Sequence, residues 1–444
     1  MTYNNLKKKL KDFDSEIYNH IQDEYDRQKN SIELIASENV TSKPVLECLG
    51  SVLTNKYSEG YPNKRYYGGN VIIDKIETLC QKRALEAFNL DEKIWSVNVQ
   101  PYSGSPANFA LYTAILNTND RIMGLSLASG GHLTHGYYTK NKSISATSKY
   151  FQSLSYETND EGYIDYDELE KLSKLFCPKL IICGYSAYSR DLDYKRFREI
   201  ADINNSFLTC DMSHFNGFVA CGILNNPFEY CDFVTTTTHK TLGGPRSGII
   251  FCKKEFENKI NNSIFPGLQG GPHEHQIGAL ATQLKYVKTE EYKSYISQVL
   301  KNSKKLAEIL MNLEFNISTN GTDNHIILIN LKNKDISGTK VEKLCELINI
   351  SINKNSVKGD TSALNPNGIR IGTPSITTRG MKEIDMVIIA DFLDKVIKLG
   401  IEIQNISGKK IKDFLIELNK NENIQKINIL KNEVKTFINK FDFY

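Results

Sequence analysis

The sequence lacks the features that would point to a membrane or to nucleic acid. No apolar run approaches the roughly 20 residues that a helix needs to cross a bilayer. Neither sign of charge dominates, because 55 Lys and Arg stand against 52 Asp and Glu and leave a net charge of +3. So small an imbalance argues against nucleic acid or an anionic membrane as the main partner. We therefore expect no membrane association and no nucleic-acid partner.

The cysteines lack any pairing pattern. The nine cysteines form no C-x-x-C motif and no metal-like spacing, and their number is odd. This usage fits buried, unpaired thiols in a reducing compartment. The N-terminus has no apolar core of the signal-peptide type, and it carries acids from Asp12 onward, which argues against a transit peptide. The sequence thus predicts a cytoplasmic protein without a metal site.

The length of the chain, 444 residues, is too great for one small core, so two domains of unequal size are expected. We predict an N-terminal helical arm at 1–30, a large domain at 31–285 and a smaller α+β domain at 286–444. The arm carries apolar residues at spacings of three and four, and this stripe needs cover from the protein body or from a partner subunit. The stripe consists of Phe13, Ile17, Tyr18, Ile21 and Tyr25.

Strand and helix patterns alternate over residues 179–234, which predicts an α/β fold with parallel strands and right-handed crossovers. In such a sheet, ligands bind beyond the carboxyl ends of the strands. Five predicted strands end in polar residues, so these residues should converge on one side of one sheet. They are Ser103–Ser105, His132, Ser186, Asp211 and Lys240.

Lys240 stands in the most distinctive stretch, residues 232–251. Four consecutive threonines favour extended backbone and deliver His239 and Lys240 to a Gly-Gly-Pro turn. A lysine held at such a strand end is partly desolvated, which lowers its pKa, and a neutral amine attacks carbonyl groups. Lys240 is therefore a candidate Schiff-base lysine. The alternative is an ordinary surface lysine, which these neighbours make a weaker interpretation.

Two further strand ends carry groups suited to a ligand. Ser103–Ser105 lie between a strand and an apolar helix, where small residues and the helix N-terminus favour a phosphate. That signal is weak alone, since many capping turns look the same. His132 and His135 lie among glycines that permit close approach to a ligand. A metal pair is the alternative, but no third ligand has a suitable spacing.

A tyrosine-rich segment at 55–70 reads as a loop, because Gly and Pro interrupt any helix. Tyrosines on a loop provide rigid stacking area with a hydroxyl at the tip, as binding surfaces do. A loop packed on its own domain is the alternative. The segment holds Tyr57, Glu59, Tyr61, Arg65, Tyr66 and Tyr67.

Two more polar residues have two interpretations each. Arg370 lies in an alternating strand, where it either faces solvent or reaches a carboxylate. Ser37 directly follows an apolar run at the edge of a core, but this region also fits the cap of a following helix, with Thr41 or Ser42 in the capping role.

One cofactor would use all these groups, namely an aldehyde with a phosphate and a basic ring nitrogen. Lys240 would form an imine with the aldehyde, and Asp211 would pair with the protonated ring nitrogen. His132 would stack on the ring, while Arg370 would bind a substrate carboxylate with two hydrogen bonds. The residues therefore point to pyridoxal-phosphate chemistry on an amino acid.

Eight motifs in the right order, spread over nearly the whole chain, resemble serine hydroxymethyltransferase. They are YSEGYPNKRYYGG, SGSPAN, GGHLTHG, DMSH, TTTTHK, GPR, QGGP and GIRIGTP. The resemblance implies a fold-type I pyridoxal-phosphate enzyme, like aspartate aminotransferase, whose large domain contains a mostly parallel seven-stranded sheet flanked by helices. It also implies a homodimer, or a dimer of dimers, with active sites shared between subunits.

The resemblance implies roles for individual residues. Around the cofactor it implies the covalent lysine, the ring-nitrogen partner, the stacking histidine, the phosphate contacts and groups near the 3′-oxygen: Lys240, Asp211, His132, Ser103, Gly104, Ser105, Ser186, His214, His239 and Thr237. Residues expected from the neighbouring subunit are Tyr57, Glu59, Tyr67 and Gly271. The amino-acid carboxylate is expected near Ser37, His239 and Arg370, and the folate pterin near Leu127, Gly131, Leu133 and Asn355.

The implied reaction converts L-serine and tetrahydrofolate to glycine and 5,10-methylenetetrahydrofolate, with Glu59 handling a proton. Threonine aldolase and aminotransferase share the lysine, aspartate and arginine, and a catalytically inert relative kept as a binding protein is a third alternative. Two positions depart from the pattern. Gly243 is expected to loosen the turn after the lysine, and the stretch 357–367 is about one residue short on the folate side.

Overall fold

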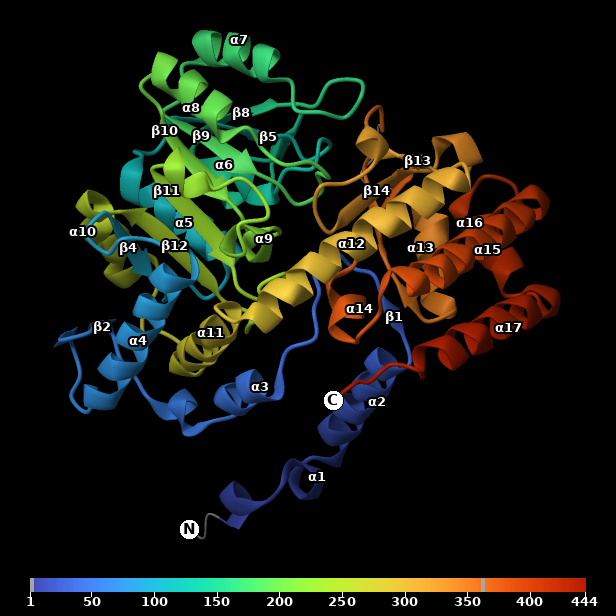
Figure 1. The fold of residues 1–444 in the computed structure, drawn as a ribbon, viewed down its shortest axis with the longest axis horizontal. Coiled ribbons are helices and arrows are strands. Elements are labelled where there is room, and N and C mark those ends of the chain that lie inside the picture. Colours follow the sequence, from blue (N-terminus) through green and yellow to red (C-terminus); the bar gives the residue numbers. More distant parts are fainter. Residues whose placement is uncertain (1–3, 361–363) are drawn as a thin grey trace.

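A seven-stranded sheet forms the centre of the first of two parts of the molecule in the computed structural model, which describes residues 4–360 and 364–444 (Figure 1). All its strands are parallel except β12, which runs antiparallel to both neighbours. This confirms the predicted mostly parallel sheet. In spatial order the strands are β4 (Trp95–Asn98), β12 (Gly248–Lys253), β11 (Phe233–Thr237), β10 (Phe207–Asp211), β9 (Leu180–Gly184), β5 (Arg121–Leu125) and β8 (Gln152–Tyr156).

Alternate residues of these strands bury side chains in two separate apolar layers, one on each face of the sheet. Ile181 and Met123 belong to one layer, and their neighbours Ile182 and Ile122 belong to the other. This period of two is what a sheet covered by helices on both faces requires. The first layer contains residues of α4 (Val71–Ala87), α7 (Tyr166–Phe176), α8 (Tyr194–Ile203) and α11 (Glu274–Val287), and the second those of α5 (Gly104–Ile115) and α10 (Glu257–Asn262).

The second part of the molecule is built on a four-stranded antiparallel sheet. Its strands are β13 (Asn316–Ile317), β14 (Ile326–Asn330), β17 (Gly368–Gly372) and β16 (Asn353–Asn355), in that spatial order. Its apolar core takes residues from α13 (Gly338–Leu347), α15 (Glu383–Ser407), α16 (Ile411–Leu418) and α17 (Asn421–Ile438).

Two segments connect this second core with the rest of the chain. The short strand β1 (Ile32–Glu33) pairs with β15 (Ile350–Ser351), so Ile32 and Leu34 are buried in the second core. Helix α12 (Glu290–Asn312) buries its first half in the first core and its second half in the second. The division at 31–285 and 286–444 remains a prediction.

The N-terminal arm consists of α1 (Leu10–Phe13) and α2 (Ser15–Lys29), and it extends away from both cores (Figure 1). Neither helix buries a residue. Phe13 is 59% exposed and Ile21 is 50% exposed, whereas the Tyr25 ring meets Phe443 edge to face at 5.4 Å, so only the Tyr25 end of the apolar stripe has cover within the described chain. The expected cover from a partner subunit stays a prediction.

The remaining α-helices and strands are short. They are α3 (Lys43–Leu49), β2 (Gly60–Tyr61), β3 (Lys64–Arg65), β6 (Tyr138–Thr139), β7 (Lys142–Ser143), α6 (Ala146–Tyr150), α9 (Asn216–Ala220) and α14 (Pro374–Thr378). Ser42 occupies the cap position of α3, but its side chain makes no capping hydrogen bond. Among the described residues, no helix combines the length and the apolar character needed to cross a membrane.

Candidate active site

Asp211, the last residue of β10, is the most heavily hydrogen-bonded carboxylate of the site. Its Oδ1 accepts hydrogen bonds from the backbone and hydroxyl of Ser213, and its Oδ2 accepts from Asn108 Nδ2 at 2.8 Å and from His135 Nε2 at 3.3 Å. Burial alone would raise the pKa of Asp211, but the hydrogen bond from His135 and the nearby basic groups hold it well below its usual range. The carboxylate is therefore charged although it is buried.

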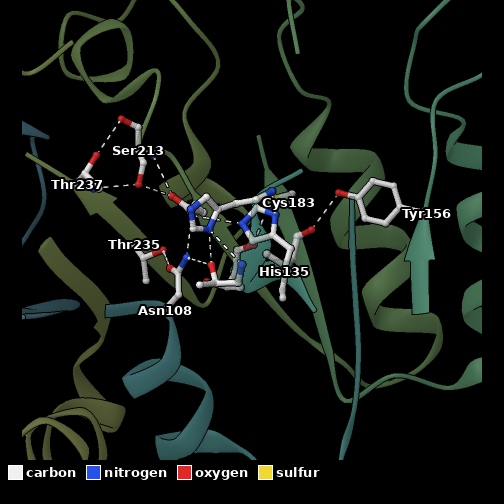
Figure 2. Close-up of polar contacts among 12 residues, drawn as sticks. Asn108, His135, Tyr156, Cys183, Ser213, Thr235 and Thr237 are labelled. Carbon is white, nitrogen blue, oxygen red and sulfur yellow. Dashed lines mark hydrogen bonds and ion pairs between the residues drawn. The ribbon is translucent and has the colours of Figure 1, made fainter. Parts of the chain in front are cut away.

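The threonine run on β11 supports this carboxylate from the neighbouring strand. Thr235 is the register partner of Asp211, and its hydroxyl donates to Asn108 Oδ1 at 2.5 Å, which orients the Asn108 amide toward Asp211. Thr237 N donates to Ser213 Oγ at 3.0 Å. Figure 2 shows these contacts closing around the strand end. The threonine run on β11 therefore forms the predicted extended backbone and also contributes hydrogen bonds to the network around Asp211.

His135 has both ring nitrogens occupied. Its Nδ1 accepts from the backbone of His132 at 3.2 Å, so its proton lies on Nε2 and is donated to Asp211. The side chains of His132, His135 and Asp211 have potential metal-ligand atoms within 4.8 Å of one another. The sequence interpretation found no third metal ligand to join the two histidines. The fold brings Asp211 to that position. Because His135 and Asp211 bind each other, this grouping is a hydrogen-bonded network.

His132 begins the turn that follows β5, and it is half-buried. Its Nδ1 lies 2.7 Å from Thr134 Oγ1 and also accepts from Thr134 N, which fixes the ring. Burial lowers the pKa of His132 to about 4, so the ring is neutral at pH 7. The preceding glycines serve the chain itself: a Cβ on Gly131 would lie 1.9 Å from Leu125 O, and one on Gly130 would lie 2.1 Å from Ala187 O. Close backbone packing is therefore one reason for these glycines, and their expected approach to a ligand stays a prediction.

Lys240 follows β11 and is 9% exposed. Burial lowers the pKa of its amine to about 8, with Asp211 favouring the charged form and Arg370 opposing it. The turn behind it is well held, because Asn39 Nδ2 donates to Lys240 O at 3.1 Å and Gly243 N donates to the same oxygen at 3.0 Å. An ordinary surface lysine is thus excluded.

Gly243 has a φ of +74°, in the left-handed region where glycine is the favoured residue. A side chain at this position would be strained, so glycine suits the turn. The expectation that Gly243 loosens the turn stays a prediction.

Helix α5 begins at Gly104, with Ser103 in the cap position. The Ser103 side chain makes no capping hydrogen bond, so the first turn keeps its N–H groups for another acceptor. A Cβ on Gly104 would lie 2.6 Å from Thr237 Cγ2, which explains the glycine. Ser105 is exposed beside it.

Arg370, in β17 of the second sheet, reaches the first part of the molecule. Its guanidinium donates to Ser186 O at 2.6 Å and to Asn353 Oδ1 at 3.0 Å, so it does not simply face solvent. Burial lowers the pKa of Arg370 to about 10. His239, next to the lysine, has a buried Nδ1 that finds no hydrogen-bond partner among the described residues, and burial lowers its pKa to about 3.

The residues expected around folate lie in the loop after β5, in the short helical turn that follows it and at the end of β16. Leu127 and Gly131 belong to the loop after β5, and Leu133 is 44% exposed beside His132. Asn355 ends β16 and bonds Ser356 O with its own amide. Within the shortened stretch 357–367, residues 361–363 lie outside the described residues. Ser37 is half-buried in the segment after β1.

A second polar cluster stands apart on the surface. Tyr57 Oη donates to Glu59 Oε1 at 3.1 Å, the Tyr57 and Tyr67 rings meet edge to face at 5.2 Å, and Tyr57 packs over Gly271. Tyr57 is 53% exposed. We call this cluster of Tyr57, Glu59, Tyr67 and Gly271 the exposed half, and Lys240, Asp211 and His132 with their hydrogen-bond partners the buried half. No hydrogen bond between described residues joins the two.

The base of the exposed half is a buried ionic network. Ser58, which stands between Tyr57 and Glu59 in the sequence, donates a hydrogen bond to Glu274 Oε1 at 2.6 Å. Arg65 pairs with Asp74 at 2.9 Å and with Glu77 at 2.6 Å, and its side chain is 4% exposed. Arg65 is therefore structural, which accounts for its presence in the tyrosine-rich segment.

Several functional neighbours escaped the sequence interpretation. Asn108 and Ser213 lie inside quoted motifs, SGSPAN and DMSH, but nothing in their spacing shows that they bind Asp211. His135 was expected, with His132, to contact a ligand, and its hydrogen bond to Asp211 was not foreseen. His325, from the second part of the molecule, was not considered.

Comparison with known proteins gives matches along almost the whole chain. The family profile described as serine hydroxymethyltransferase matches residues 10–393. Serine hydroxymethyltransferase 4 of Arabidopsis thaliana is 55% identical over 441 residues, covering 96% of this chain and 93% of that protein. Serine hydroxymethyltransferase 3, chloroplastic, of the same plant is 52% identical, covering 97% and 84%. The cytosolic serine hydroxymethyltransferase of Oryctolagus cuniculus is 50% identical, covering 97% and 93%.

Proposed function

The chain belongs to the serine hydroxymethyltransferase family, and from this premise we propose that it interconverts L-serine and glycine, with tetrahydrofolate as the acceptor and donor of the one-carbon unit. It is an enzyme of one-carbon transfer. We further propose pyridoxal 5′-phosphate, bound covalently on Lys240, as its cofactor. The observation that carries the proposal is a buried lysine of lowered pKa beside a buried, charged aspartate at the carboxyl edge of a parallel sheet.

The residues present fit pyridoxal phosphate. The four hydrogen bonds to Asp211 keep it anionic, as a partner for a protonated ring nitrogen must be. The uncapped start of α5 at Ser103 and Gly104 suits a phosphate, with Ser105 beside it. When bound, the cofactor supplies an electron sink for negative charge at the substrate's α-carbon.

The chain's own residues would bind and orient the cofactor. His132, neutral and fixed by Thr134, has a ring face suited to stacking on the cofactor. Thr237, Ser186, His214 and His239 are assigned to the surroundings of the lysine and of the cofactor's 3′-oxygen. Lys240 has a pKa of about 8, so a sizeable fraction of the cofactor-free protein carries a neutral, nucleophilic amine near neutral pH.

Substrate contacts are proposed in two groups. Arg370, a partly buried cation, would hold the amino-acid carboxylate together with Ser37 and His239. The folate pterin would lie at the rim formed by Leu127, Gly131, Leu133 and Asn355.

We propose that the protein is a homodimer or a dimer of dimers. In either assembly, the exposed half of each chain completes the buried half of its partner. Support comes from the exposure of Tyr57, Tyr67 and the arm stripe in the single chain. Glu59, from the partner, would donate and accept the proton at the one-carbon unit, with Tyr67 beside it, while Tyr57 and Gly271 would reach the phosphate. We also propose a cytoplasmic location, although the relatives include a chloroplastic protein as well as a cytosolic one.

The visible spectrum of the purified protein tests this proposal. We expect an absorption band of the bound cofactor, and a new long-wavelength band only when glycine and tetrahydrofolate are both added. A band that responds to glycine and ignores folate would favour an aldolase and contradict the folate assignment. No band after addition of pyridoxal phosphate would contradict the cofactor assignment and favour an inert relative.

A further inference from the structure

His325 is a fully buried histidine that links the second sheet to the active site. It directly precedes β14, and its Nε2 lies 3.1 Å from Ala36 O and 3.4 Å from His214 Nδ1. The rings of His214 and His325 are nearly parallel, at an interplanar angle of 9°, and Phe218 stacks on His325 at 5.8 Å. His214 follows β10 three residues after Asp211. One imidazole therefore contacts the segment before Ser37 and the side chain of His214.

These two contacts fix which nitrogens carry protons. The carbonyl of Ala36 only accepts, so His325 must carry a hydrogen on Nε2. Burial lowers the pKa of His325 to about 3 and the pKa of His214 well below its ordinary value, so both rings are neutral. Since His325 Nε2 bears the hydrogen, the facing Nδ1 of His214 must present a lone pair. The proton of His214 then lies on its own Nε2.

Two details show that this arrangement is more than packing. His325 Nδ1 is buried without a hydrogen-bond partner among the described residues, a free-energy cost that a purely apolar side chain would avoid. His214 Nε2 has no hydrogen-bond partner in the described chain either, so its N–H stays free for a ligand. Lys240 influences the pKa of both histidines, which places the pair next to the site.

We propose that His325 is a positioning residue for the reaction: its Nε2–H, shared between Ala36 O and His214 Nδ1, holds His214 in the Nε2–H form and so makes His214 a hydrogen-bond donor to the cofactor's 3′-oxygen. This inference rests on the proposed function, from which it takes the cofactor and the placing of its 3′-oxygen. It adds the residue that sets the tautomer of His214.

Two substitutions separate the hydrogen bond from the volume of the ring. His325→Leu removes the N–H and keeps an apolar side chain, whereas His325→Gln keeps an amide N–H of similar reach. We expect His325→Leu to raise the dissociation constant for pyridoxal phosphate about tenfold and to move the pH midpoint of the cofactor's visible band by about one unit. His325→Gln should restore both to within about twofold of the natural protein.

Phe218→Leu is the matched packing control, because it removes the ring stacked on His325 and leaves both nitrogen contacts. It should keep the natural pH midpoint. The proposal is overturned if His325→Leu leaves the dissociation constant and midpoint unchanged, or if Phe218→Leu shifts the midpoint as much as His325→Leu does.

A direct measurement covers the case in which His325→Leu does not fold. Solid-state ¹⁵N spectra of histidine-labelled full-length protein are compared with those of His214→Asn, and the signals that vanish belong to His214. An Nε2-protonated ring supports the proposal, and an Nδ1-protonated ring overturns it. This experiment needs no cofactor, so a protein that binds no pyridoxal phosphate would refute the proposed function and still test the tautomer of His214.

Discussion

The buried half and the exposed half of the site are built by opposite means. In the buried half, side chains that lie on or follow β5, β10 and β11 bind one another and Asn108 of α5, and Asp211 alone accepts four hydrogen bonds. In the exposed half, Tyr57 and Glu59 bond each other, and the aromatic rings around them face solvent. The first half is complete within one chain. The exposed half resembles a surface that a partner subunit would cover, and the ionic network of Arg65 lies beneath it.

The largest effect is expected from the centre of the buried half. Lys240→Ala should lower the rate of serine cleavage by at least about 10³-fold, because it removes the nucleophilic amine. The product assay with serine and tetrahydrofolate measures this, and sedimentation should give the same assembly as the natural protein. Lys254→Ala, at an exposed lysine, is the control and should keep its rate. A normal rate for Lys240→Ala would refute the assignment.

Mixing variants tests whether the two halves come from different chains. Glu59→Gln should bind pyridoxal phosphate normally and lose about 10²-fold in the folate-dependent reaction. Refolding Lys240→Ala with Glu59→Gln in equal amounts should restore about a quarter of the natural activity, because half of the dimers are mixed and each has one intact site.

That recovery depends on the sharing of sites. If both halves served the same chain, each mixed dimer would contain two damaged sites and the mixture would stay as inactive as its parts. A mixture without recovery, from dimers shown to exchange subunits, contradicts the shared site.

A smaller, pH-dependent effect is expected below the exposed half. Burial raises the pKa of Glu274 to about 7, so the folded protein keeps this proton in a range where the unfolded chain, with the ordinary pKa of 4.5, has lost it. The free energy of unfolding therefore falls as pH rises from about 4.5 to about 7 and changes no further above that. Glu274→Gln retains an acceptor for Ser58 and should remove this contribution.

The measurement is urea unfolding at pH 5 and pH 8. Relative to the natural protein, Glu274→Gln should gain on the order of 2 kcal/mol at pH 8 and much less at pH 5. Glu33, whose pKa burial raises to about 8, contributes equally to both proteins and cancels in the difference. A difference that is the same at both pH values would contradict the role given to Glu274.

The smallest effect concerns the turn behind the lysine. Gly243→Ala should lower the free energy of unfolding by about 1 kcal/mol, since alanine resists the φ of +74°. Gly222→Ala, with a φ of +66° and open space around it, isolates the backbone cost, and Gly68→Ala, in open space without a positive φ, should cost little. An unchanged stability for Gly243→Ala would show that the turn relaxes.

The buried half was the more predictable of the two, for a topological reason. Parallel strands end on the same edge, so Asp211, Lys240 and Ser103 could be brought together from the order of the strands alone. Asn108 and Ser213 could not, because their hydrogen bonds depend on the exact rotation of a helix and a turn. His325 lies 111 residues from His214 in sequence, and only the tertiary fold brings the two into contact.

The exposed half shows a different limit of sequence analysis. The tyrosines of residues 55–70 indicated a binding surface, but they do not all serve it: Tyr61 donates to Asn261 O at 2.6 Å and packs into its own domain. Which tyrosines pack and which face solvent depends on the hairpin of β2 and β3, whose strands are too short to show a period. The resemblance to a family supplied what the local pattern lacked.

Helix α12 has a mechanical consequence for how the site is held. Its 23 residues form a rod of roughly 35 Å, with Ile296 and Val299 fixed in one core and Leu306 and Leu310 in the other. A continuous helix buried in both cores stiffens the connection between them. Arg370 belongs to the second part of the molecule and Lys240 to the first, so bending or rolling of α12 would change the distance between the proposed carboxylate-binding group and the proposed Schiff-base lysine.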